Sequence, residues 1–443
     1  MGRLFGTDGV RGVAGRDLTT ELAHGIGRAL VATVGSPRPR VAVGRDTRAS
    51  GEMLEAALAA GICSAGGDVL LLGVVPTPAV AFLTVDLGAD AGAVISASHN
   101  PPEDNGIKLF SSDGMKLPDM VEDEIERVVG EGDGPRPEGL EVGRIVPEQD
   151  DAAERYLAHL AGSVDGTLGG MKVVVDGANG AAYRLGPMLL RRLGADVFAI
   201  GDEPDGTNIN VGCGATHPET LAEAVRRFGA DAGVAHDGDA DRAILCDAEG
   251  EIVDGDHMLA ACALAMRDEG TLAKDVVVAT VMANLGFRRA MEEAGITVVE
   301  TQVGDRYVLE EMRRTGALLG GEQSGHVIFL DAATTGDGLL TAARFLAIAR
   351  ARGVSVAELA SVVRKLPQVL VAVEVEDRED VEEAEEVREA VRAAEEALGD
   401  RGRVLVRASG TEPVVRVMVE AEDDEDARRH AEAIAASVRR ARG

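Results

Sequence analysis

Aromatic residues are scarce in this sequence. Tryptophan is absent, and aromatic residues make up only 2% of the 443 residues. Proteins that hold single-stranded nucleic acid stack the bases on aromatic side chains, so the composition argues against such a platform. Hydrophobic residues still account for 45%, and the core therefore has to be filled by valine, leucine, isoleucine and alanine. The sequence predicts a folded protein with an aliphatic interior.

Cysteines are few, and long apolar runs are missing. The four cysteines, Cys63, Cys213, Cys246 and Cys262, are widely spaced and form no CxxC pair. This spacing excludes the dense disulfide framework of a small secreted fold, and reduced thiols are expected. No run approaches the about 18 apolar residues of a membrane span, and residues 1–12 do not have the pattern of a signal peptide. We expect a cytoplasmic protein that does not bind membranes.

Basic residues are fewer than acidic residues in this chain. The chain has 45 lysines and arginines against 76 aspartates and glutamates, a formal net charge of −31. A field of this sign repels nucleic acid and anionic membrane surfaces, which argues against both as partners. A small phosphorylated substrate meets the same repulsion. An enzyme that binds one must therefore concentrate arginines and a metal cation in its cleft.

The length of the chain and its apolar pattern predict several α/β domains. A chain of 443 residues exceeds the size of a single hydrophobic core. Short valine-rich runs such as Val41–Val43 and Val69–Leu72 alternate with stretches of helical period such as Met53–Ala65. Residues 130–149 are polar and rich in glycine, proline and glutamate, which predicts a surface connection and a domain boundary.

The rest of the chain repeats this alternation of strand-like and helix-like stretches, and the pattern changes in its last part. Buried-type strands are predicted at Met171–Asp176 and Val276–Val281, one in each of two further α/β domains. The last part has a strand-like alternation at Val369–Val375 and a highly charged helix predicted over Val381–Leu398, which indicates a smaller α+β domain. The predicted domains are residues 1–150, 151–253, 254–367 and 368–443.

The most specific motif is the acidic turn DGDADR. Asp237, Asp239 and Asp241 stand on alternate residues between two apolar runs. Carboxylates this close raise one another's pKa unless a cation offsets them, and an oxygen-only ligand set favours Mg²⁺, Mn²⁺ or Ca²⁺ over zinc. An EF-hand loop needs glycine at its sixth position and glutamate at its twelfth, where this chain has Arg242 and Ala248. The turn therefore predicts a Mg²⁺ site.

A second motif surrounds Ser98. The run ISASHNP ends an apolar strand in an Asn-Pro turn, and NGIK, which ends at Lys108, follows shortly after. Taken alone, a serine in such a turn is most often a capping or turn residue. The hydrolase elbow G-x-S-x-G is excluded, because Ser96 and Asn100 stand where glycines are needed. A chemical role for Ser98 is favoured only because the other motifs occur in the same chain.

Two more loops offer groups that suit a sugar phosphate. RASGTEP begins at Arg407 and is followed by Arg416, and its hydroxyls, backbone N–H groups and guanidiniums are the groups that grip phosphate. An ordinary hairpin loop is the alternative. GGEQSGH ends at His326 and places a carboxylate, an amide, a hydroxyl and an imidazole in one turn. These groups suit sugar hydroxyls, although His326 by itself is equally well explained as a structural histidine.

The four motifs, in this order along the chain, resemble those of the α-D-phosphohexomutase superfamily. The resemblance spans the whole chain, and FGTDGVRG at residues 5–12, PDGTNIN at 204–210 and Gln323 fit the amino-sugar branch. It implies α/β architecture, with three related α/β/α sandwich domains and a smaller C-terminal α+β domain around a central cleft.

The resemblance also implies an activity. It is the interconversion of glucosamine 6-phosphate and glucosamine 1-phosphate, an intramolecular phosphotransfer through a bisphosphate intermediate that feeds UDP-N-acetylglucosamine and cell-wall synthesis. A phosphomannomutase or phosphoglucomutase activity of the same superfamily is the alternative. The implied partners are the phosphorylated hexosamine and its bisphosphate, and the protein would be a monomer or a homodimer.

Residue roles follow from the same resemblance. Ser98 would carry a covalent phosphate and complete the site of one Mg²⁺, and a lowered pKa would suit Lys108 to accept a proton. Which residue is the general base stays open between Lys108 and His326. The implied catalytic residues are Ser98, Lys108, His326, Arg242 and Arg11; the metal ligands are Ser98, Asp237, Asp239 and Asp241; the substrate-binding residues are Glu322, Ser324, Arg306, Arg407, Ser409, Gly410, Thr411 and Arg416.

Two other functions remain open from the residues alone. The DxD pattern is similar to that of haloacid-dehalogenase-like phosphatases, in which Asp237 would be the nucleophile, although a phosphatase needs no dedicated serine such as Ser98. A sugar-phosphate sensor would keep the cleft without catalysis, but the intact Ser98, Lys108 and aspartates argue against it. Phosphate on Ser98 rather than on Asp237 would exclude the first alternative, and turnover would exclude the second.

Overall fold

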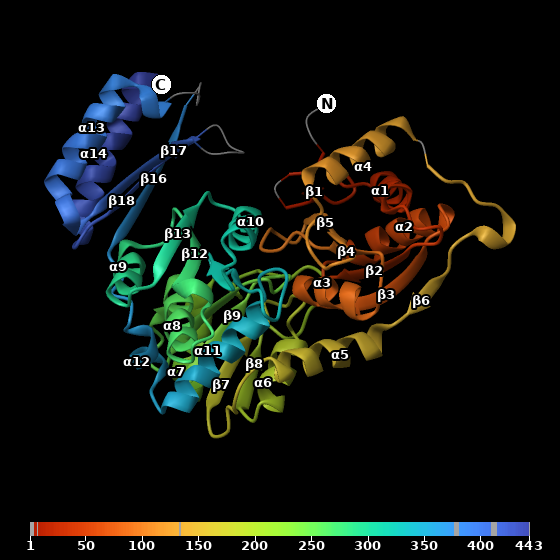
Figure 1. The fold of residues 1–443 in the computed structure, drawn as a ribbon, viewed down its shortest axis with the longest axis horizontal. Coiled ribbons are helices and arrows are strands. Elements are labelled where there is room, and N and C mark those ends of the chain that lie inside the picture. Colours follow the sequence, from red (N-terminus) through yellow and green to blue (C-terminus); the bar gives the residue numbers. More distant parts are fainter. Residues whose placement is uncertain (1–3, 7, 133, 376–380, 409–413, 443) are drawn as a thin grey trace. The chain divides into compact units, whose positions relative to one another are not determined.

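The chain folds into two compact units (Figure 1). The computed structural model describes residues 4–6, 8–132, 134–375, 381–408 and 414–442. The first unit comprises Met1–Met282 with Ile296–Val362, and the second comprises Ala283–Gly295 with Val363–Gly443. None of the helices in these described ranges has the length and hydropathy needed to cross a membrane.

A six-stranded sheet forms the first part of the first unit. Its described strands are β1 Val10–Val13, β2 Arg40–Arg45, β3 Asp68–Val74, β4 Ala91–Ile95, β5 Asp104–Ser111 and β6 Ile145–Pro147, and its helices are α1 Thr20–Val34, α2 Gly51–Ser64, α3 Thr77–Asp86, α4 Asp119–Glu131 and the short 3-10 helix η1 Gly139–Glu141. The strand order is β1-β5-β4-β2-β3-β6. Every residue of β4 is buried, as expected for a central strand that is apolar throughout.

A short strand lies within the segment predicted as a surface connection. Its residues, Ile145–Pro147, make up β6 and pair in parallel with Val69–Leu71 of β3. The outer edge of β3 carries backbone groups that require partners, and an extended segment beside it supplies them. The side chains of β6 are apolar but exposed, and a run of 3 residues is too short to show the period of a strand.

Two further sheets complete the first unit. The second has β7 Lys172–Asp176, β8 Asp196–Ile200, β9 Ala232–His236, β10 Ala243–Asp247 and β11 Ile252–Val253, with α5 Gln149–Gly162, α6 Leu185–Arg192 and α7 Pro218–Phe228 nearby in the sequence. The third has β12 Val276–Thr280, β13 Thr297–Thr301, β14 Leu319–Gly321 and β15 Val327–Phe329, and the helices of this region are α8 Gly255–Asp268, η2 Ala273–Asp275, α10 Asp305–Thr315, α11 Gly338–Arg352 and α12 Val356–Ala360. Their strand orders are β11-β10-β9-β7-β8 and β13-β12-β14-β15.

The same four-strand arrangement occurs in all three sheets. The four strands are β2–β5 in the first sheet, β7–β10 in the second and β12–β15 in the third. In each set, the first strand pairs in parallel with the second and with the third, and the fourth runs antiparallel to the third. The turn between the third and fourth strands carries Ser98 in the first sheet, the three aspartates in the second and His326 in the third. The repeat therefore places three of the predicted site loops at equivalent positions.

The second unit is a small α+β structure. It contains α9 Leu285–Glu293, β16 Gln368–Glu374, η3 Val381–Glu383, α13 Glu385–Leu398, η4 Gly399–Arg401, β17 Arg403–Ala408, β18 Val414–Glu420 and α14 Asp424–Arg442. Its sheet is antiparallel in the order β16-β18-β17. Helices α13 and α14 lie side by side against this sheet, in blue in Figure 1. The charged helix predicted over Val381–Leu398 is real but begins at Glu385, after a separate 3-10 turn.

The predicted fold class is confirmed: three related α/β domains are followed by a smaller α+β domain. The predicted boundaries at residues 150, 253 and 367 stay predictions. The division into two compact units follows a different criterion, since it groups Ala283–Gly295 with the C-terminal residues.

A buried glutamate holds the second unit together. The Glu420 side chain has no exposed surface, and its carboxylate accepts hydrogen bonds from Leu285 N at 3.0 Å, Asn284 Nδ2 at 3.3 Å and Arg403 Nε at 3.1 Å. Asn284 in turn caps α9 and bonds the backbone of Leu366. The carboxylate thus joins the end of β18 to the start of α9.

Replacing Glu420 by alanine is expected to destabilise the second unit by about 3–5 kcal/mol, because it leaves the Arg403 guanidinium and a backbone N–H without their buried acceptor. Hydrogen exchange of the β16 and β18 amides measures this as a loss of protection. Glu422→Ala is the matched control, since Glu422 is exposed two residues further on. Equal protection in the two variants would contradict the role given to Glu420.

Candidate active site

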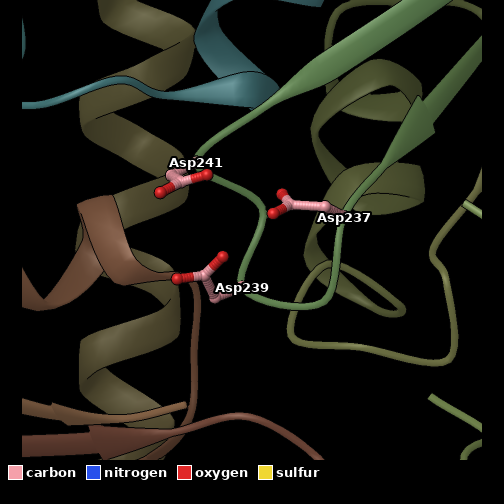
Figure 2. A group of neighbouring side chains, drawn as sticks. All are labelled: Asp237, Asp239 and Asp241. Carbon is pink, nitrogen blue, oxygen red and sulfur yellow. The ribbon is translucent and has the colours of Figure 1, made fainter. Parts of the chain in front are cut away.

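Three aspartate side chains converge at the turn between β9 and β10. Figure 2 shows the carboxylates of Asp237, Asp239 and Asp241 turned toward one another. One oxygen of each lies within 4.8 Å of the others, and the three residues are only 1%, 0% and 4% exposed. The turn at residues 237–242 between two buried strands gives this result, because β9 and β10 pair up to His236 and Ala243 and leave the aspartates at the closed end.

The electrostatics of the cluster are those of a cation site. Burial, together with Asp241 and Asp239, raises the pKa of Asp237 well above its usual range. Burial acts in the same direction on Asp241, but Lys108 and His326 outweigh it and leave the pKa of Asp241 far below its usual range. The Oδ1 atoms of Asp239 and Asp241 are buried and have no hydrogen-bond partner among the described residues. Unused oxygen lone pairs in an oxygen-only cluster fit a hard divalent cation.

Ser98 meets this cluster from the first sheet. Its Oγ donates a hydrogen bond to Asp237 Oδ2 at 2.6 Å, although the two residues are 139 positions apart in the chain. Ser98 is 1% exposed and has a backbone φ of 52°, which is in the left-handed region. A Cβ on Gly238 would lie 2.4 Å from the Ser98 carbonyl oxygen. Glycine at this position therefore allows the two turns to approach.

Lys108 lies among carboxylates, and one prediction about it is wrong. Its Nζ is 2.9 Å from Asp239 Oδ2, 2.8 Å from Asp8 Oδ2 and 3.7 Å from Asp241 Oδ2. Burial lowers the pKa of Lys108, but the three carboxylates outweigh burial and raise it above the usual lysine value. The sequence analysis expected a lowered pKa because it counted the neighbouring cations and not Asp8.

His326 and two arginines complete the surroundings. His326 Nε2 accepts a hydrogen bond from Gly336 N at 3.1 Å, and its Nδ1 is 3.7 Å from Asp241 Oδ2. Burial lowers the pKa of His326, but Asp241 more than offsets this and the pKa is raised. Arg242 Nη1 is 3.5 Å from His99 Nδ1, and Arg11 reaches the carbonyl of Ala97 at 3.5 Å. Both guanidiniums thus border the Ser98 turn.

The predicted sugar-binding side chains are less closely gathered. Glu322 Oε1 accepts a hydrogen bond from Gly304 N at 3.1 Å, and Ser324 is exposed. Gln323 donates to Asp256 Oδ2 at 3.2 Å. Arg306 is engaged elsewhere: its guanidinium pairs with Asp119, Glu122 and Glu310. Its role in substrate binding stays a prediction, and it requires these ion pairs to open.

The predicted phosphate loop belongs to the second unit. Arg407 and Arg416 are opposite each other on β17 and β18. Burial, with the neighbouring charge of Arg416, lowers the pKa of Arg407. Like charges on facing strands destabilise a sheet unless an anion offsets them. Ser409, Gly410 and Thr411 lie outside the described residues, and their predicted roles stay predictions.

Sequence reasoning missed four polar residues at this site. Asp8 and Lys116 form an ion pair, and Lys116 also pairs with Asp305. Thr77 Oγ1 donates to Asp239 Oδ2 at 2.7 Å, beside Lys108. Asp8 lies in the FGTDGVRG motif and Asp305 directly precedes the predicted site residue Arg306, so these positions offered a usable sequence signal. No sequence signal marked Thr77 or Lys116, because their partners lie at least 100 residues away in the chain.

Family comparisons agree with this arrangement. Four sequence models of the phosphoglucomutase/phosphomannomutase family match the chain in order. They are alpha/beta/alpha domain I at residues 2–135, domain II at 154–250, domain III at 254–366 and the C-terminal domain at 370–437.

Individual relatives cover nearly the whole chain. A phosphoglucosamine mutase of Thermobifida fusca is 57% identical and the match covers 99% of this chain and 98% of the relative; that of Streptomyces griseus is 56% identical and the match covers 100% of both. A solved phosphoglucomutase/phosphomannomutase family protein from Burkholderia thailandensis superposes with a TM-score of 0.83 at 28% identity, over 99% of this chain and 97% of that one. The chain therefore belongs to the phosphoglucomutase/phosphomannomutase family, and within it to the phosphoglucosamine mutases.

Proposed function

We propose that this enzyme, an isomerase that acts on a phosphosugar, interconverts glucosamine 6-phosphate and glucosamine 1-phosphate. The observation that carries the proposal is the hydrogen bond of 2.6 Å between Ser98 Oγ and Asp237 Oδ2, which joins a serine to a buried aspartate cluster able to bind a metal. A phosphatase that used Asp237 would have no need of this serine. The high identity to phosphoglucosamine mutases supports the amino sugar as substrate.

The proposed cation is Mg²⁺, held by Asp237, Asp239 and Asp241 and by a phosphate on Ser98. The Oδ1 atoms of Asp239 and Asp241, which accept no hydrogen bond from the described residues, support this ligand set. When bound, the ion offsets the negative charge that develops on a phosphoryl group in transfer.

The chemistry consists of two phosphoryl transfers. First, the 1-hydroxyl of glucosamine 6-phosphate attacks the phosphorus on Ser98; a new P–O bond forms, the bond to Ser98 Oγ breaks, and the hydroxyl proton leaves to a base. The resulting 1,6-bisphosphate reorients, and Ser98 Oγ takes the 6-phosphoryl group in the same way. Glucosamine 1-phosphate is released, the phosphate on Ser98 is restored, and no group is gained or lost.

Lys108 and His326 are the candidates to move the proton. Three carboxylates raise the pKa of Lys108, so in this environment it holds a proton that it can give to a departing oxygen. His326 donates toward Asp241 from Nδ1 in the tautomer that Gly336 N imposes. Arg242 and Arg11 are positioned to offset negative charge at the Ser98 turn.

The proposal also covers substrate binding, the location of the protein in the cell and its oligomeric state. Glu322, Ser324 and Arg306 would contact the sugar; Arg407, Ser409, Gly410, Thr411 and Arg416 would hold the phosphate that is not being transferred. We further propose a cytoplasmic monomer or homodimer. Gel filtration with light scattering tests the oligomeric state.

Parallel kinetics on three substrates test the function. The purified enzyme is expected to convert glucosamine 6-phosphate with a kcat/KM at least about 10-fold above those for glucose and mannose 6-phosphates, since a site with polar groups for an amine leaves them unpaired with a hydroxyl. Mass spectrometry of the intact protein, followed by peptide mapping, is expected to find phosphate on Ser98. Phosphate on Asp237 and release of inorganic phosphate would show a phosphatase, and no turnover of any hexose phosphate would show a sensor.

A further inference from the structure

A buried ion pair lies directly beneath the Ser98 turn. Arg48 Nε donates to Asp46 Oδ2 at 2.9 Å, and neither side chain has any exposed surface. Taking two charges fully out of water is costly unless every donor and acceptor is satisfied. The hydrogen bonds of the pair show which part of the chain these two buried charges hold.

The remaining donors of Arg48 all reach the backbone of the serine turn. Nη2 donates to the carbonyl oxygens of Ser98 and Asn100, both at 2.9 Å. Nη1 donates to the carbonyl oxygen of Asp104 at 3.0 Å and to that of Pro101. One planar guanidinium thus fixes four carbonyl groups between the end of β4 and the start of β5. A lysine, with a single ammonium, cannot reproduce this fork.

Ser96 links the same pair to the nucleophile itself. Its Oγ donates to Asp46 Oδ2 at 2.5 Å and accepts from Ser98 N at 3.0 Å. Ser96 is fully buried. Both backbone groups of Ser98, the N–H through Ser96 and the carbonyl through Arg48, are therefore held by one cluster, which consists of Asp46, Arg48 and Ser96.

The backbone of Ser98 shows why such a hold is needed. Its φ of 52° is a conformation that residues with a side chain disfavour, and it persists only where the surroundings impose it. This conformation accompanies the hydrogen bond from Ser98 Oγ to Asp237. From the loop between β8 and α7, Asn210 Nδ2 also donates to the Ser98 carbonyl at 2.9 Å. A relaxed turn would move Oγ away from the aspartates.

We propose that Asp46, Arg48 and Ser96 are positioning residues of the phosphoryl transfer, which set the direction of Ser98 Oγ without touching substrate. The proposal rests on the proposed function, in which Ser98 carries the phosphoryl group. Alignment is the main demand of phosphoryl transfer, and a displacement of about 1 Å costs about 100-fold in rate. Substrate binding depends on other residues, so the loss should fall on kcat and not on KM.

Steady-state kinetics of Ser96→Ala and Arg48→Lys test the proposal, with glucosamine 6-phosphate as substrate. Both variants are expected to lose about 10- to 100-fold in kcat while KM stays within about twofold. The first phosphorylation of dephosphorylated enzyme by glucosamine 1,6-bisphosphate, followed by intact mass, is expected to slow by a similar factor. Ser96→Ala removes a single oxygen and carries the test if Arg48→Lys does not fold.

Arg45→Lys is the matched control. Arg45 is the last residue of β2 and pairs with Glu52 and Glu55 of α2, and none of its side-chain hydrogen bonds within the described residues reaches the Ser98 turn. Its kcat is expected to stay within about twofold of wild type. Thermal midpoints are measured for all variants, and assays are run well below the lowest.

Three results would overturn the positioning role. They are wild-type kcat in folded Ser96→Ala, a raised KM with unchanged kcat, or an equal loss of kcat in Arg45→Lys. Wild-type enzyme that carries no phosphate on Ser98 and turns over no glucosamine phosphate would instead refute the proposed function, and the positioning role with it. The wild-type measurement therefore distinguishes the two failures.

Discussion

Replacement of Ser98 by alanine is expected to lower kcat for glucosamine 6-phosphate by at least about 10,000-fold and to abolish phosphorylation of the protein, since the oxygen that carries the phosphoryl group is removed. The fold should survive. Alanine and serine are equally disfavoured at the φ of 52°, and the hydroxyl contacts that are lost, to Asp237 Oδ2 at 2.6 Å and to His99 Nδ1 at 3.3 Å, contribute about 1 kcal/mol each. Activity, intact mass and circular dichroism of the same preparation measure the three quantities.

The control for this variant is Ser112→Ala. Ser112 is exposed just after β5 and lies outside the aspartate cluster, so wild-type activity is expected. Ser98→Thr gives a further comparison, because it keeps a hydroxyl but its β-branched side chain is disfavoured at positive φ. Residual activity above about 1% in Ser98→Ala, a hundred times the ceiling expected from loss of a covalent nucleophile, would refute the phosphoserine mechanism.

Removal of the divalent cation is expected to lower kcat by at least about 1,000-fold, because the ion offsets several kcal/mol of developing phosphoryl charge. Three buried carboxylates with oxygens within 4.8 Å of one another also repel when no cation is bound. Binding should therefore stabilise the fold, by about 2.7 kcal/mol at 100 times the dissociation constant. Activity after chelation and readdition of Mg²⁺, and thermal unfolding with and without Mg²⁺, measure the two effects.

Asp239→Asn tests the ligand assignment independently of activity. Its amide oxygen can still accept from Thr77 and Lys108, so the metal-free fold should be retained, but the thermal shift with Mg²⁺ should be lost. Asp247→Asn is the control, since Asp247 on β10 caps the Glu249 and Glu251 amides away from the cluster. An undiminished Mg²⁺ shift in Asp239→Asn, or full activity in excess chelator, would exclude the aspartates as the metal site.

Local patterns predicted the strands and helices well where burial follows a period. Val69–Leu72 and Met171–Asp176 became the buried strands β3 and β7, and Met53–Ala65 corresponds to α2. The short strand β6 was missed because its three apolar residues, Ile145–Pro147, are too short a run to show a period within a polar segment. The charged helix α13 begins four residues later than predicted. Its charges mark a solvated face, and they do not mark the residue at which a helix begins.

In the candidate site too, some features could be predicted from the sequence and others could not. The aspartate cluster was predictable because its members are two residues apart, and a turn between buried strands must bring them together. The environment of Lys108 was not, since Asp8 and Asp239 lie 100 and 131 positions from it in the sequence. The direction of its pKa shift was therefore predicted with the wrong sign. Arg306 was assigned by motif, and only the structure shows that α4 carboxylates engage it.

By itself the sequence determined the family, the α/β architecture, the aspartate turn and the identity of Ser98 as the residue to test. These depend on short local patterns and on the order of the motifs along the chain, and both can be seen without the fold. The tertiary structure decided that Ser98 Oγ lies 2.6 Å from Asp237, that three carboxylates surround Lys108, and that Arg48 holds the serine turn. The physical reason is the repeated sheet. Three turns between third and fourth strands occupy equivalent places in their sheets, and where such turns meet is set by the packing of whole sheets and not by any local pattern.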